Sequence, residues 1–443
     1  MFFSINIHSI FSKGNSSMAE NEAKASAPDE TRVSSAVESS ASESSRTSIK
    51  YGNVKTKPVV EAVEGITFDF NFGLRVYFPQ TGLKYHLMFK NADTGLVLYD
   101  SDVEPGMVVS SVKKYYMRIT FVVTRQGTGE KVFEHTTDLR GRKVVVQFPV
   151  GTIGDSIGWF SYMERFQRKH GCNLVLVVSD FLRDLVQRQY PQFEFIHADD
   201  VPGANAYATY YIGLFFNGDT NYQPVDFRQA GLHRTAAYIL GLRTKDELED
   251  IPPRLDLSAK RAVRGKYAVI ATKASSQAKY WNNQNGWHSV IKFLNDNGYR
   301  VLCIDKERVH GAGLVYNHIP WGVEDLTGEI PLQERVNVIK DADFFIGLPS
   351  GLSWLAWCCN VPVVMISGFS LPNTEFYTPY RVINYDVCTG CWDDMRENFD
   401  HNDFFWCPRH KDGKSQFECT KYITDEQVIN MIKTIPTFRP GKK

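Results

Sequence analysis

The sequence predicts an α/β protein in which two doubly wound domains follow a small all-β domain and a disordered N-terminal segment. Three observations support this fold class. The chain has 443 residues, about three times the usual size of one domain. Short alternating strands come first, and two successive sets of buried strands that alternate with helices follow them. We therefore expect ligands at the carboxyl ends of the strands, in the crevice between the two α/β domains.

Residues 1–50 are predicted to be disordered. From Lys13 to Lys50 the segment is rich in Ser, Ala and Glu and has almost no large apolar residue, so it cannot bury enough surface to offset the entropy cost of ordering. The opening residues are apolar but lack a basic cluster and a cleavage site, which argues against a secretory signal. Met18 is a second candidate for the start of translation.

Residues 51–142 are predicted to form a barrel-like β domain. Its runs alternate between polar and apolar residues and are separated by turns rich in Gly, Pro and Asn, a pattern typical of antiparallel strands. The expected strands are 66–72, 74–79, 84–91, 96–102, 115–125 and 131–138. Their aromatic residues are most simply core, although an aromatic sheet face could also bind protein or sugar.

Residues 143–262 and 263–443 are predicted to be the two doubly wound domains. The run 143–150 is almost wholly apolar, as expected of a parallel strand that is covered on both faces. Further strands of the first domain are expected at 173–180, 193–200 and 210–216, with helices at 181–189 and 227–242. In the second domain, strands and helices are expected to alternate, beginning with a strand. Their ranges are 266–275, 286–298, 299–306, 332–342, 343–351, 352–360 and 361–367.

The composition and the missing motifs exclude several classes of function. Fifty basic and fifty acidic residues give a formal net charge of zero, which argues against broad nucleic-acid binding. No apolar run is long enough to span a bilayer. No strand is followed by G-x-G-x-x-G and no P-loop occurs, which counts against dinucleotide dehydrogenases and P-loop enzymes. Eight cysteines are too few for a disulfide scaffold, so reduced thiols or metal ligands in a cytoplasmic protein are expected.

The strongest single motif is a group of four cysteines near the C-terminus. Cys388 and Cys391 form a C-x2-C pair. Cys407 and Cys419 follow in the same short segment. Four thiolates complete a tetrahedral site with no open position, so the predicted role is structural, with zinc or a single iron as the ion. Free thiols or a redox pair are the alternative, although no thioredoxin-like context surrounds them.

The segment Gly151–Asp155 lies between the first buried strand and the helix that follows it. Glycines there let the backbone turn tightly and leave room for a substrate, and Asp155 is expected to project at the mouth of the crevice. An acidic residue at a helix start is by default an N-cap or a partner of the helix dipole. Capping and catalysis are compatible, so both interpretations are kept.

Three junctions in the second domain have the chemistry of a nucleotide site. The segment Thr272–Trp281 carries hydroxyls and lysines that suit a diphosphate. The Gly-rich turn at Gly351–Ser353 would present the amides of a helix start to phosphate. The segment Asp325–Gly328 could bond a ribose or simply cap the helix over 332–340.

Together these motifs resemble a known family. The segments GTIGDSIGW, ATKASSQAKYW, EDLTG and GLPSGLSWLAWCCNVPVVMISG are similar to those of GT-B glycosyltransferases that transfer heptose from ADP-heptose. The four cysteines and the preceding β domain narrow the resemblance to the bacterial autotransporter heptosyltransferases, over residues 64–435. The resemblance implies a GT-B fold, serine acceptors in the passenger domain of an autotransporter adhesin, iron at the four cysteines and a large homo-oligomer such as a dodecamer.

The resemblance also implies roles for individual positions. Asp155, in the acceptor-side domain, matches the catalytic aspartate, which in an inverting transfer takes the proton of the acceptor hydroxyl. The donor positions are Thr272, Ser276 and Lys279 at the diphosphate, Asp325, Thr327 and Gly328 at the nucleoside end, and Gly351, Leu352 and Ser353 at the phosphate turn. Leu348 and Pro349 replace the Asn-Asp pair that lipopolysaccharide heptosyltransferases carry in this turn, so the role of that pair is not transferred.

Two alternatives stay open. A hexosyltransferase with a UDP or GDP donor would use the same fold, because heptose is indicated by the resemblance alone. A non-catalytic, metal-stabilised module could instead bind protein or glycan through the aromatic β domain, and a change of Asp155 would leave its function intact. Three separate motifs at the predicted crevice agree with one chemistry, which favours the enzyme.

Overall fold

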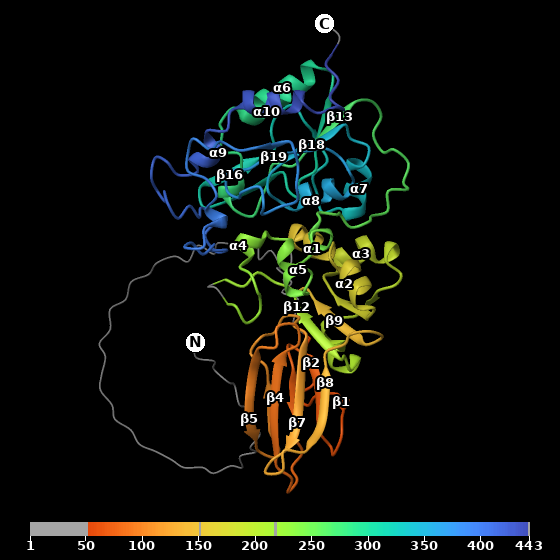
Figure 1. Ribbon diagram of the computed structural model, residues 1–443. Helices are drawn as coiled ribbons and strands as arrows, with labels where there is room; N and C mark the ends of the chain where they lie inside the picture. The colour runs from red at the N-terminus through yellow and green to blue at the C-terminus, as the bar shows by residue number, and fades with distance from the viewer. Residues whose placement is uncertain (1–51, 150–151, 217–218, 442–443) are drawn as a thin grey trace, which may run out of the picture.

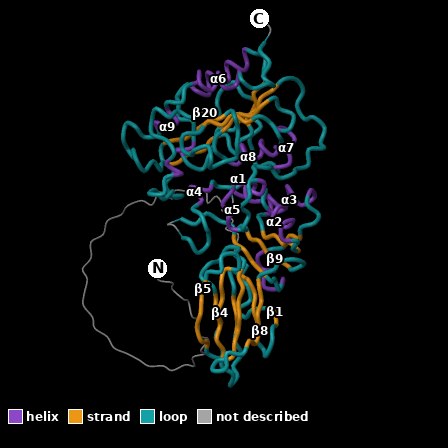
Figure 2. Tube along the Cα trace, viewed as in Figure 1, coloured by secondary structure: helices purple, strands orange, loops and turns teal. Residues whose placement is uncertain are grey.

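The computed structural model describes residues 52–149, 152–216 and 219–441, and these form three parts stacked along one axis (Figure 1). A strand-rich N-terminal region lies at one end, a first α/β lobe lies in the middle and a second α/β lobe lies at the other end (Figure 2). The segment predicted to be disordered, residues 1–50, lies outside the described residues. None of the helices in the described part of the chain has the length and apolar character that crossing a bilayer requires.

The N-terminal region consists of two packed sets of antiparallel strands, where the sequence predicts one barrel-like domain. The strands are β1 (Val60–Glu61), β2 (Thr67–Asn71), β3 (Arg75–Tyr77), β4 (Tyr85–Asn91), β5 (Val97–Val103), β6 (Val108–Ser110), β7 (Ile119–Arg125) and β8 (Lys131–Thr136). Four of them pair in the order β5-β4-β7-β8. The rings of Phe68, Phe121 and Phe133 meet with centroids 5.2 to 5.8 Å apart. They join β2 of one set to β7 and β8 of the other.

The sheet that contains β2 continues into the first lobe. The strands of this lobe are β9 (Lys143–Gln147), β10 (Asn173–Val177), β11 (Glu194–Phe195) and β12 (Ala208–Tyr211). Its α-helices are α1 (Ile153–Phe160), α2 (Met163–His170), α3 (Asp180–Val186), α4 (Phe227–Ala230) and α5 (Arg234–Ile239). Strand β2 pairs in parallel with β12, so one sheet runs in the order β11-β10-β9-β12-β2-β3-β6. The boundary expected at residue 142 falls within this continuous sheet, and it stays a prediction.

The second lobe is a doubly wound domain with a parallel sheet. Its strands are β13 (Tyr267–Ile270), β14 (Arg300–Cys303), β17 (Glu324–Asp325), β18 (Phe344–Gly347), β19 (Val363–Ile366) and β20 (Arg381–Val382), with a hairpin of β15 (Val309–Ala312) and β16 (Val315–His318). Its helices are α6 (Gly286–Asp296), α7 (Leu332–Ile339), α8 (Gly351–Cys358), α9 (Glu418–Lys421) and α10 (Asp425–Lys433). The strand order β17-β14-β13-β18-β19-β20 reverses between β13 and β18, and ligands of such sheets bind at that point.

Three predicted elements of the first lobe differ from the structure. The strand expected over 210–216 is β12, which ends at Tyr211. The helix expected over 227–242 is divided into α4 and α5, because Gly231 lies between them with a φ of 95°. A Cβ on Gly231 would lie 2.2 Å from the carbonyl oxygen of Asn373 in the second lobe, so this break is also a point of close approach. The strand expected over 193–200 ends at Phe195, because residues 198–204 form a 3-10 helix.

One apolar core joins all three parts of the molecule. It includes Phe68 in the N-terminal region, Val146 in β9 and Trp354 in α8. A separate core lies on the other face of the second sheet, around Val290 of α6 and Ile432 of α10. The two lobes are therefore connected by packed side chains, which hold the ends of their sheets against each other.

Candidate active site

The two lobes meet at the first turns of α1 and α8. Helix α1 follows β9, where the strand order of the first lobe reverses, and α8 follows β18 at the corresponding point of the second (Figure 1). A Cβ on Gly351 would lie 2.6 Å from the Cβ of Ile153, and a Cβ on Gly154 would lie 2.8 Å from Cδ1 of Trp354. Glycine at both positions lets the two helix starts touch. This contact brings the residue after Gly154 to the junction of the lobes.

That residue, Asp155, forms a capping box with Thr152. The Thr152 hydroxyl donates to Oδ2 of Asp155 over 3.1 Å, and the backbone N–H of Asp155 donates to the same hydroxyl over 3.5 Å. Burial raises the pKa of the Asp155 carboxyl, while the Lys279 ammonium and the bonds from Thr152 oppose this rise. Asp155 therefore does take part in the cap of α1. Its raised pKa also suits a general base. Gly151, which opens the predicted motif, lies outside the described residues.

Lys279 approaches Asp155 from the second lobe. It is the last residue of the 3-10 helix Gln277–Lys279, which follows β13. Burial lowers the pKa of its ammonium, and the carboxylates of Asp155 and Glu375 oppose this effect. A carboxylate from one lobe and an ammonium from the other therefore lie within electrostatic range of each other at the junction.

The hydroxyls predicted at the diphosphate are buried and bonded within the protein. Thr272 donates from its hydroxyl to Oδ2 of Asp305 over 2.8 Å, and its backbone N–H donates to the same carboxylate. The Ser276 hydroxyl donates to the carbonyl oxygen of Phe404 over 3.2 Å. Sequence reasoning missed Asp305, although its place just after a buried strand on the same sheet edge was a usable signal. These bonds shape the loop that carries Lys279, and donor binding by the two hydroxyls stays a prediction.

Asp325 organises a turn at the end of β17. Its Oδ1 accepts hydrogen bonds from the backbone N–H and the hydroxyl of Thr327, over 2.9 and 2.6 Å. Its Oδ2 pairs with Nε of Arg308 at 2.9 Å, and Gly328 follows with a φ of 139°. The alternative that this segment caps the next helix is wrong, because α7 has Pro331 at its N-cap. The role of this turn at the nucleoside end of the donor stays a prediction.

The predicted phosphate turn lies at the start of α8, where backbone N–H groups are the candidate phosphate ligands. Ser350 is the N-cap of the helix. The hydroxyl of Ser353 is buried and donates to the carbonyl oxygen of Leu348 over 2.6 Å, so it closes the turn. The first amides of a helix have no partner within the helix and attract anions. The N–H of Ser353 already donates to the carbonyl oxygen of Ser350 over 3.1 Å. A phosphate role of this turn would therefore fall to the amides of Gly351 and Leu352, and the role of all three residues stays a prediction.

The four predicted metal ligands lie in one loop-rich segment that ends in α9. Burial raises the pKa of Cys391 to about 12, an effect that Arg409 opposes and that Cys388 and Cys407 reinforce. Burial also raises the pKa of Cys419 to about 12, with contributions from the other three thiols. These effects show that the thiols act on one another electrostatically, and they do not place the four sulfur atoms at ligand distances. Sulfur ligands are those that zinc and iron prefer. The donor chemistry of this segment therefore fits the predicted ion.

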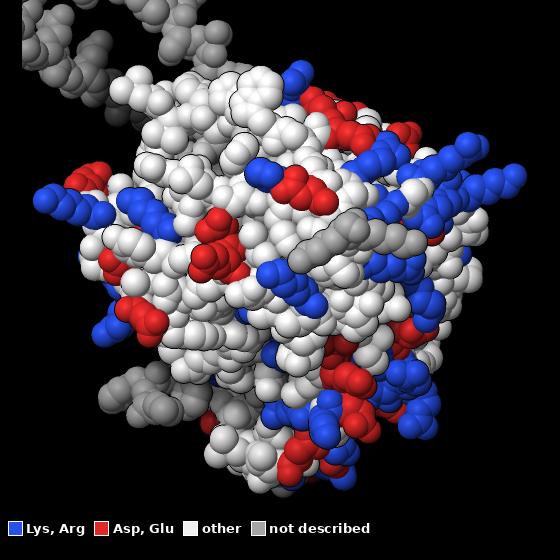
Figure 3. Space-filling model, turned by 90° about the horizontal axis from the view of Figure 1, so that it is seen from above, with Lys and Arg blue, Asp and Glu red and all other residues white. Residues whose placement is uncertain are grey.

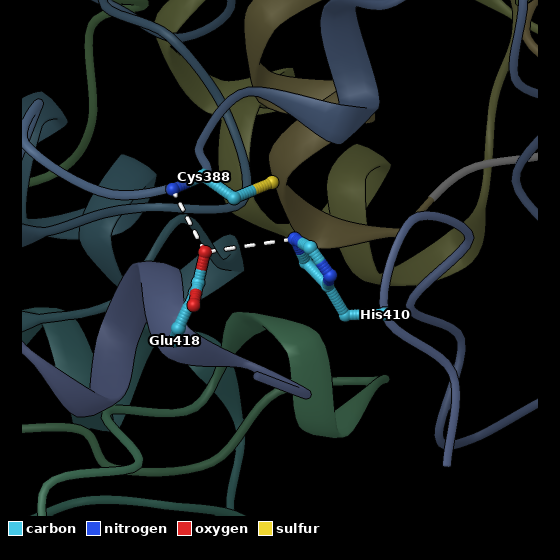
Figure 4. Close-up of side chains that lie close together, drawn as sticks. All are labelled: Cys388, His410 and Glu418. Carbon is cyan, nitrogen blue, oxygen red and sulfur yellow. Dashed lines mark hydrogen bonds and ion pairs between the residues drawn. The ribbon is translucent and has the colours of Figure 1, made fainter. Parts of the chain in front are cut away.

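A second group of candidate ligands shares one of these cysteines. Ligand atoms of Cys388, His410 and Glu418 lie within 4.8 Å of one another (Figure 4). The backbone N–H of Cys388 donates to Oε1 of Glu418 over 3.1 Å, and Nε2 of His410 lies 3.5 Å from the same oxygen. Sequence reasoning missed His410 and Glu418, because their spacing matches no metal motif. The four-cysteine ligand set stays a prediction beside this group.

Two cavities lie outside the pair of Asp155 and Lys279, and the first of them is lined by residues of both lobes. One cavity, of about 310 Å³, is lined by residues of α3 and α7, and another, of about 270 Å³, is lined by Tyr377 and Arg381 among others. Neither includes Asp155 or Lys279. On the outer face of the second lobe, acidic and basic side chains are interspersed (Figure 3). The junction is the candidate active site because it brings opposite charges together from both lobes.

Two doubly wound lobes, with a carboxylate of one and a lysine of the other within electrostatic range where the ends of their sheets face each other, define a GT-B glycosyltransferase. Comparisons with known proteins agree. Residues 63–127 match the family Glycosyltransferase TibC, N-terminal domain, and residues 232–393 match Glycosyltransferase family 9 (heptosyltransferase). The chain is 52% identical over 378 residues to the autotransporter heptosyltransferase TibC of Escherichia coli O78:H11, which covers 85% of this chain and 91% of that protein. It is 51% identical to BAHTCr of Citrobacter rodentium, with the same coverage.

The chain therefore belongs to the autotransporter heptosyltransferase family. A crystal structure of TibC from enterotoxigenic E. coli H10407, described as an iron-containing dodecameric glycosyltransferase, matches with a TM-score of 0.82 at 51% identity and covers 86% of this chain and 98% of that one. A second TibC structure, in complex with ADP-D-β-D-heptose, matches equally well. The predictions of a GT-B fold and of a heptosyltransferase are confirmed. The two alternatives, a hexosyltransferase and a non-catalytic module, are not supported by these comparisons.

Proposed function

We propose that the chain transfers heptose from ADP-heptose to serine hydroxyls in the passenger domain of an autotransporter adhesin, with inversion at the anomeric carbon and Asp155 as the general base. The donor and the class of acceptor are supported by relatives named autotransporter heptosyltransferases, one of which was solved with ADP-D-β-D-heptose. The observation that carries the proposed mechanism is the place of Asp155 in the first turn of α1, directly at the contact between the lobes, where the charge of Lys279 also acts on it.

In the proposed step, the serine Oγ attacks the anomeric carbon as the bond from that carbon to the diphosphate oxygen breaks. The Oγ proton passes to the carboxylate of Asp155, and ADP leaves with the bonding electron pair. A general base of this kind contributes about 100- to 10,000-fold in rate. Burial makes Asp155 a stronger base than an exposed aspartate, while Lys279 and Thr152 favour its ionised form.

Lys279 is proposed to stabilise the negative charge that develops on the departing diphosphate. Such stabilisation is strong where water is excluded and the charge is already in place. The loop that holds Lys279 is fixed by the bonds of Thr272 and Ser276. Further contacts to the donor are proposed for the backbone amides of Gly351 and Leu352, in the turn that the bonds of Ser353 close, and, at the nucleoside end, for Asp325, Thr327 and Gly328.

We also propose that the four cysteines hold one iron ion, with zinc as the alternative. A closed site of this kind stabilises the loop that contains it. TibC is described as iron-containing and dodecameric, and on that basis we infer a large homo-oligomer, such as a dodecamer, for this chain as well. The cytoplasmic location expected from the reduced cysteines is retained as part of the proposal.

Asp155→Asn tests the proposed mechanism. The variant should transfer heptose about 100- to 10,000-fold more slowly, because the amide cannot accept the serine proton. Intact-mass analysis of a passenger domain co-expressed with the chain measures the transfer, and a heptose adds one CH2O unit more than a hexose. ADP binding, measured by calorimetry, should be retained.

The matched control is Asp180→Asn, which changes an acidic residue in the first turn of another helix of the same lobe. This variant should transfer heptose at the rate of the unchanged protein. Equal rates for the two variants would remove Asp155 from the mechanism.

A further inference from the structure

Three aromatic rings surround the ammonium of Lys279. Its Nζ lies 5.3 Å from the ring centroid of Phe369, 5.6 Å from that of Trp392 and 5.8 Å from that of Phe399. The rings also contact one another, with centroids 5.4 to 5.6 Å apart. A ring face within about 6 Å attracts a cation, and it does so more strongly where water is excluded. We call Phe369, Trp392 and Phe399 the Lys279 cage.

Two of the three rings come from the cysteine loop. Trp392 and Phe399 both lie between the second and the third of the four cysteines. Arg409, from the same loop, donates to the carbonyl oxygen of Thr389 over 2.9 Å and pairs with Asp394 at 2.7 Å. The conformation of the loop therefore sets the position of two walls of the cage.

The cysteine loop also contacts the first lobe. The ring of Trp392 lies 5.7 Å from that of Phe227 in α4. The next residue of α4, Arg228, donates to the carbonyl oxygen of Glu397 over 2.8 Å. The loop thus contacts both lobes and also surrounds the lysine that faces Asp155.

Two carboxylates act on the same ammonium. Asp155 faces it from the first lobe and Glu375 from the second. Glu375 accepts a hydrogen bond from Ser370 over 2.8 Å and pairs with Arg381 at 2.9 Å, so its charge is already largely balanced. The carboxylate of Asp155 and the three ring faces therefore both favour the charged form of the ammonium.

We infer that the cysteine loop is part of the active site, and that Trp392 and Phe399 are positioning residues that direct the Lys279 ammonium toward the departing diphosphate. The inference rests on the proposed role of Lys279 in the transfer. It gives the loop a second task beside metal binding, because the ion would hold the loop in place and the rings of the loop would place the lysine.

Two matched pairs of variants test the inference. Phe399→Leu removes a ring and Phe399→Tyr keeps it, and Trp392→Leu and Trp392→Phe form the second pair. We expect kcat to fall about 3- to 30-fold in the leucine variants and to stay within about twofold of the unchanged protein in the aromatic variants. The KM for the acceptor should be the same in all four, because the rings act on the donor side.

The pH dependence of kcat is a second readout. If the rings had only a structural role, their loss would leave this pH dependence unchanged. A ring face stabilises the charged form of lysine, so loss of a ring lowers the pKa of Lys279 and moves the alkaline limb to lower pH by about half a unit to one unit. The metal content of each variant, measured by mass spectrometry, should be unchanged. Where a leucine variant loses metal, Phe369→Leu replaces it, since that ring lies outside the cysteine loop.

Failure of the inference differs from failure of the proposed function. If the unchanged protein does not transfer heptose from ADP-heptose, or if Lys279→Met retains full activity, the proposed function fails. If Lys279→Met is impaired but the leucine variants keep the kcat and the alkaline limb of the aromatic variants, only the role of the cysteine loop is overturned.

Discussion

Asp155 serves both its helix and the proposed reaction. It closes the capping box of α1 with Thr152, and the same position exposes its carboxyl to the charge of Lys279. Burial raises the pKa of this carboxyl, while the hydroxyl and the ammonium oppose the rise. Its strength as a base is therefore set by its surroundings, because an aspartate in water has a lower pKa and takes up a proton less readily.

The acid limb of kcat/KM should reflect this pKa. Only ionised Asp155 accepts a proton, so activity should fall as the pH drops through a pKa above the ordinary value of 3.8. Thr152→Val removes a hydrogen bond that lowers this pKa, so the limb should move to higher pH by about one unit. Rates of transfer over a pH series, measured by mass spectrometry, check both expectations.

The control for loss of a helix cap is Thr424→Val, which removes the capping hydroxyl of the distant helix α10. It should leave the acid limb where it is. An identical limb in the two valine variants would contradict the assignment of the limb to Asp155.

The cysteine segment shows how an irregular stretch of chain can hold a defined shape. Between β20 and α9 its only assigned regular element within the described residues is the 3-10 turn Cys391–Asp393. Regular backbone hydrogen bonds of helices and sheets therefore contribute little to the shape of this segment. Side-chain contacts hold it instead. Arg409, for example, bridges Thr389 and Asp394, and the thiols add the ligands of the proposed ion.

Cys391→Ser should unfold this segment. Both Cys391 and Cys359 are buried thiols, so serine at either position costs about 1–3 kcal/mol for the buried hydroxyl. Cys391→Ser should in addition lose the metal, and its melting temperature should fall well below that of the control Cys359→Ser. Calorimetric melting and metal analysis of the purified proteins measure the difference. Equal melting temperatures and equal metal contents would show that Cys391 is not a ligand.

Both lobes are needed to build the proposed active site. Asp155 comes from the first and Lys279 from the second, and the contact between the starts of α1 and α8 sets their approach. The shared apolar core, which extends from the N-terminal strands to Trp354, supports that contact. The catalytic geometry is thus a property of the whole molecule and not of either lobe.

Gly351→Ala should separate the lobes while leaving the helix intact. The added Cβ would lie 2.6 Å from Cβ of Ile153, and a displacement of about 1 Å at a reacting centre can cost about 100-fold in rate. The clash costs about 1–3 kcal/mol, and the gain of about 1 kcal/mol that alanine has over glycine in a helix offsets only part of it, so the melting temperature should fall slightly. Transfer assays and thermal melting measure the two effects. Gly82→Ala, where a Cβ would meet nothing within 4 Å, is the control, and equal activity of the two variants would show that the close contact is dispensable.

Much of this organisation could be predicted from local pattern. The apolar run 143–150 and its successors indicated parallel strands, because strands buried on both faces carry few polar residues. Gly154 and Gly351 marked the two helix starts that meet. The place of Asp155 beside one of them followed from the same pattern, and its catalytic role stays a prediction. The division of the helix over 227–242 was missed, because the break depends on an approach of Gly231 to the second lobe.

Local sequence was sufficient for the class of fold and the strand-to-helix junctions, since periodicity and turn chemistry are encoded by neighbouring residues. Long-range packing set the pairing of β2 with β12, the bond from Thr272 to Asp305 and the rings around Lys279. Each of these contacts joins residues that are far apart in the chain. Their proximity depends on how complete elements pack, which no short stretch of residues encodes.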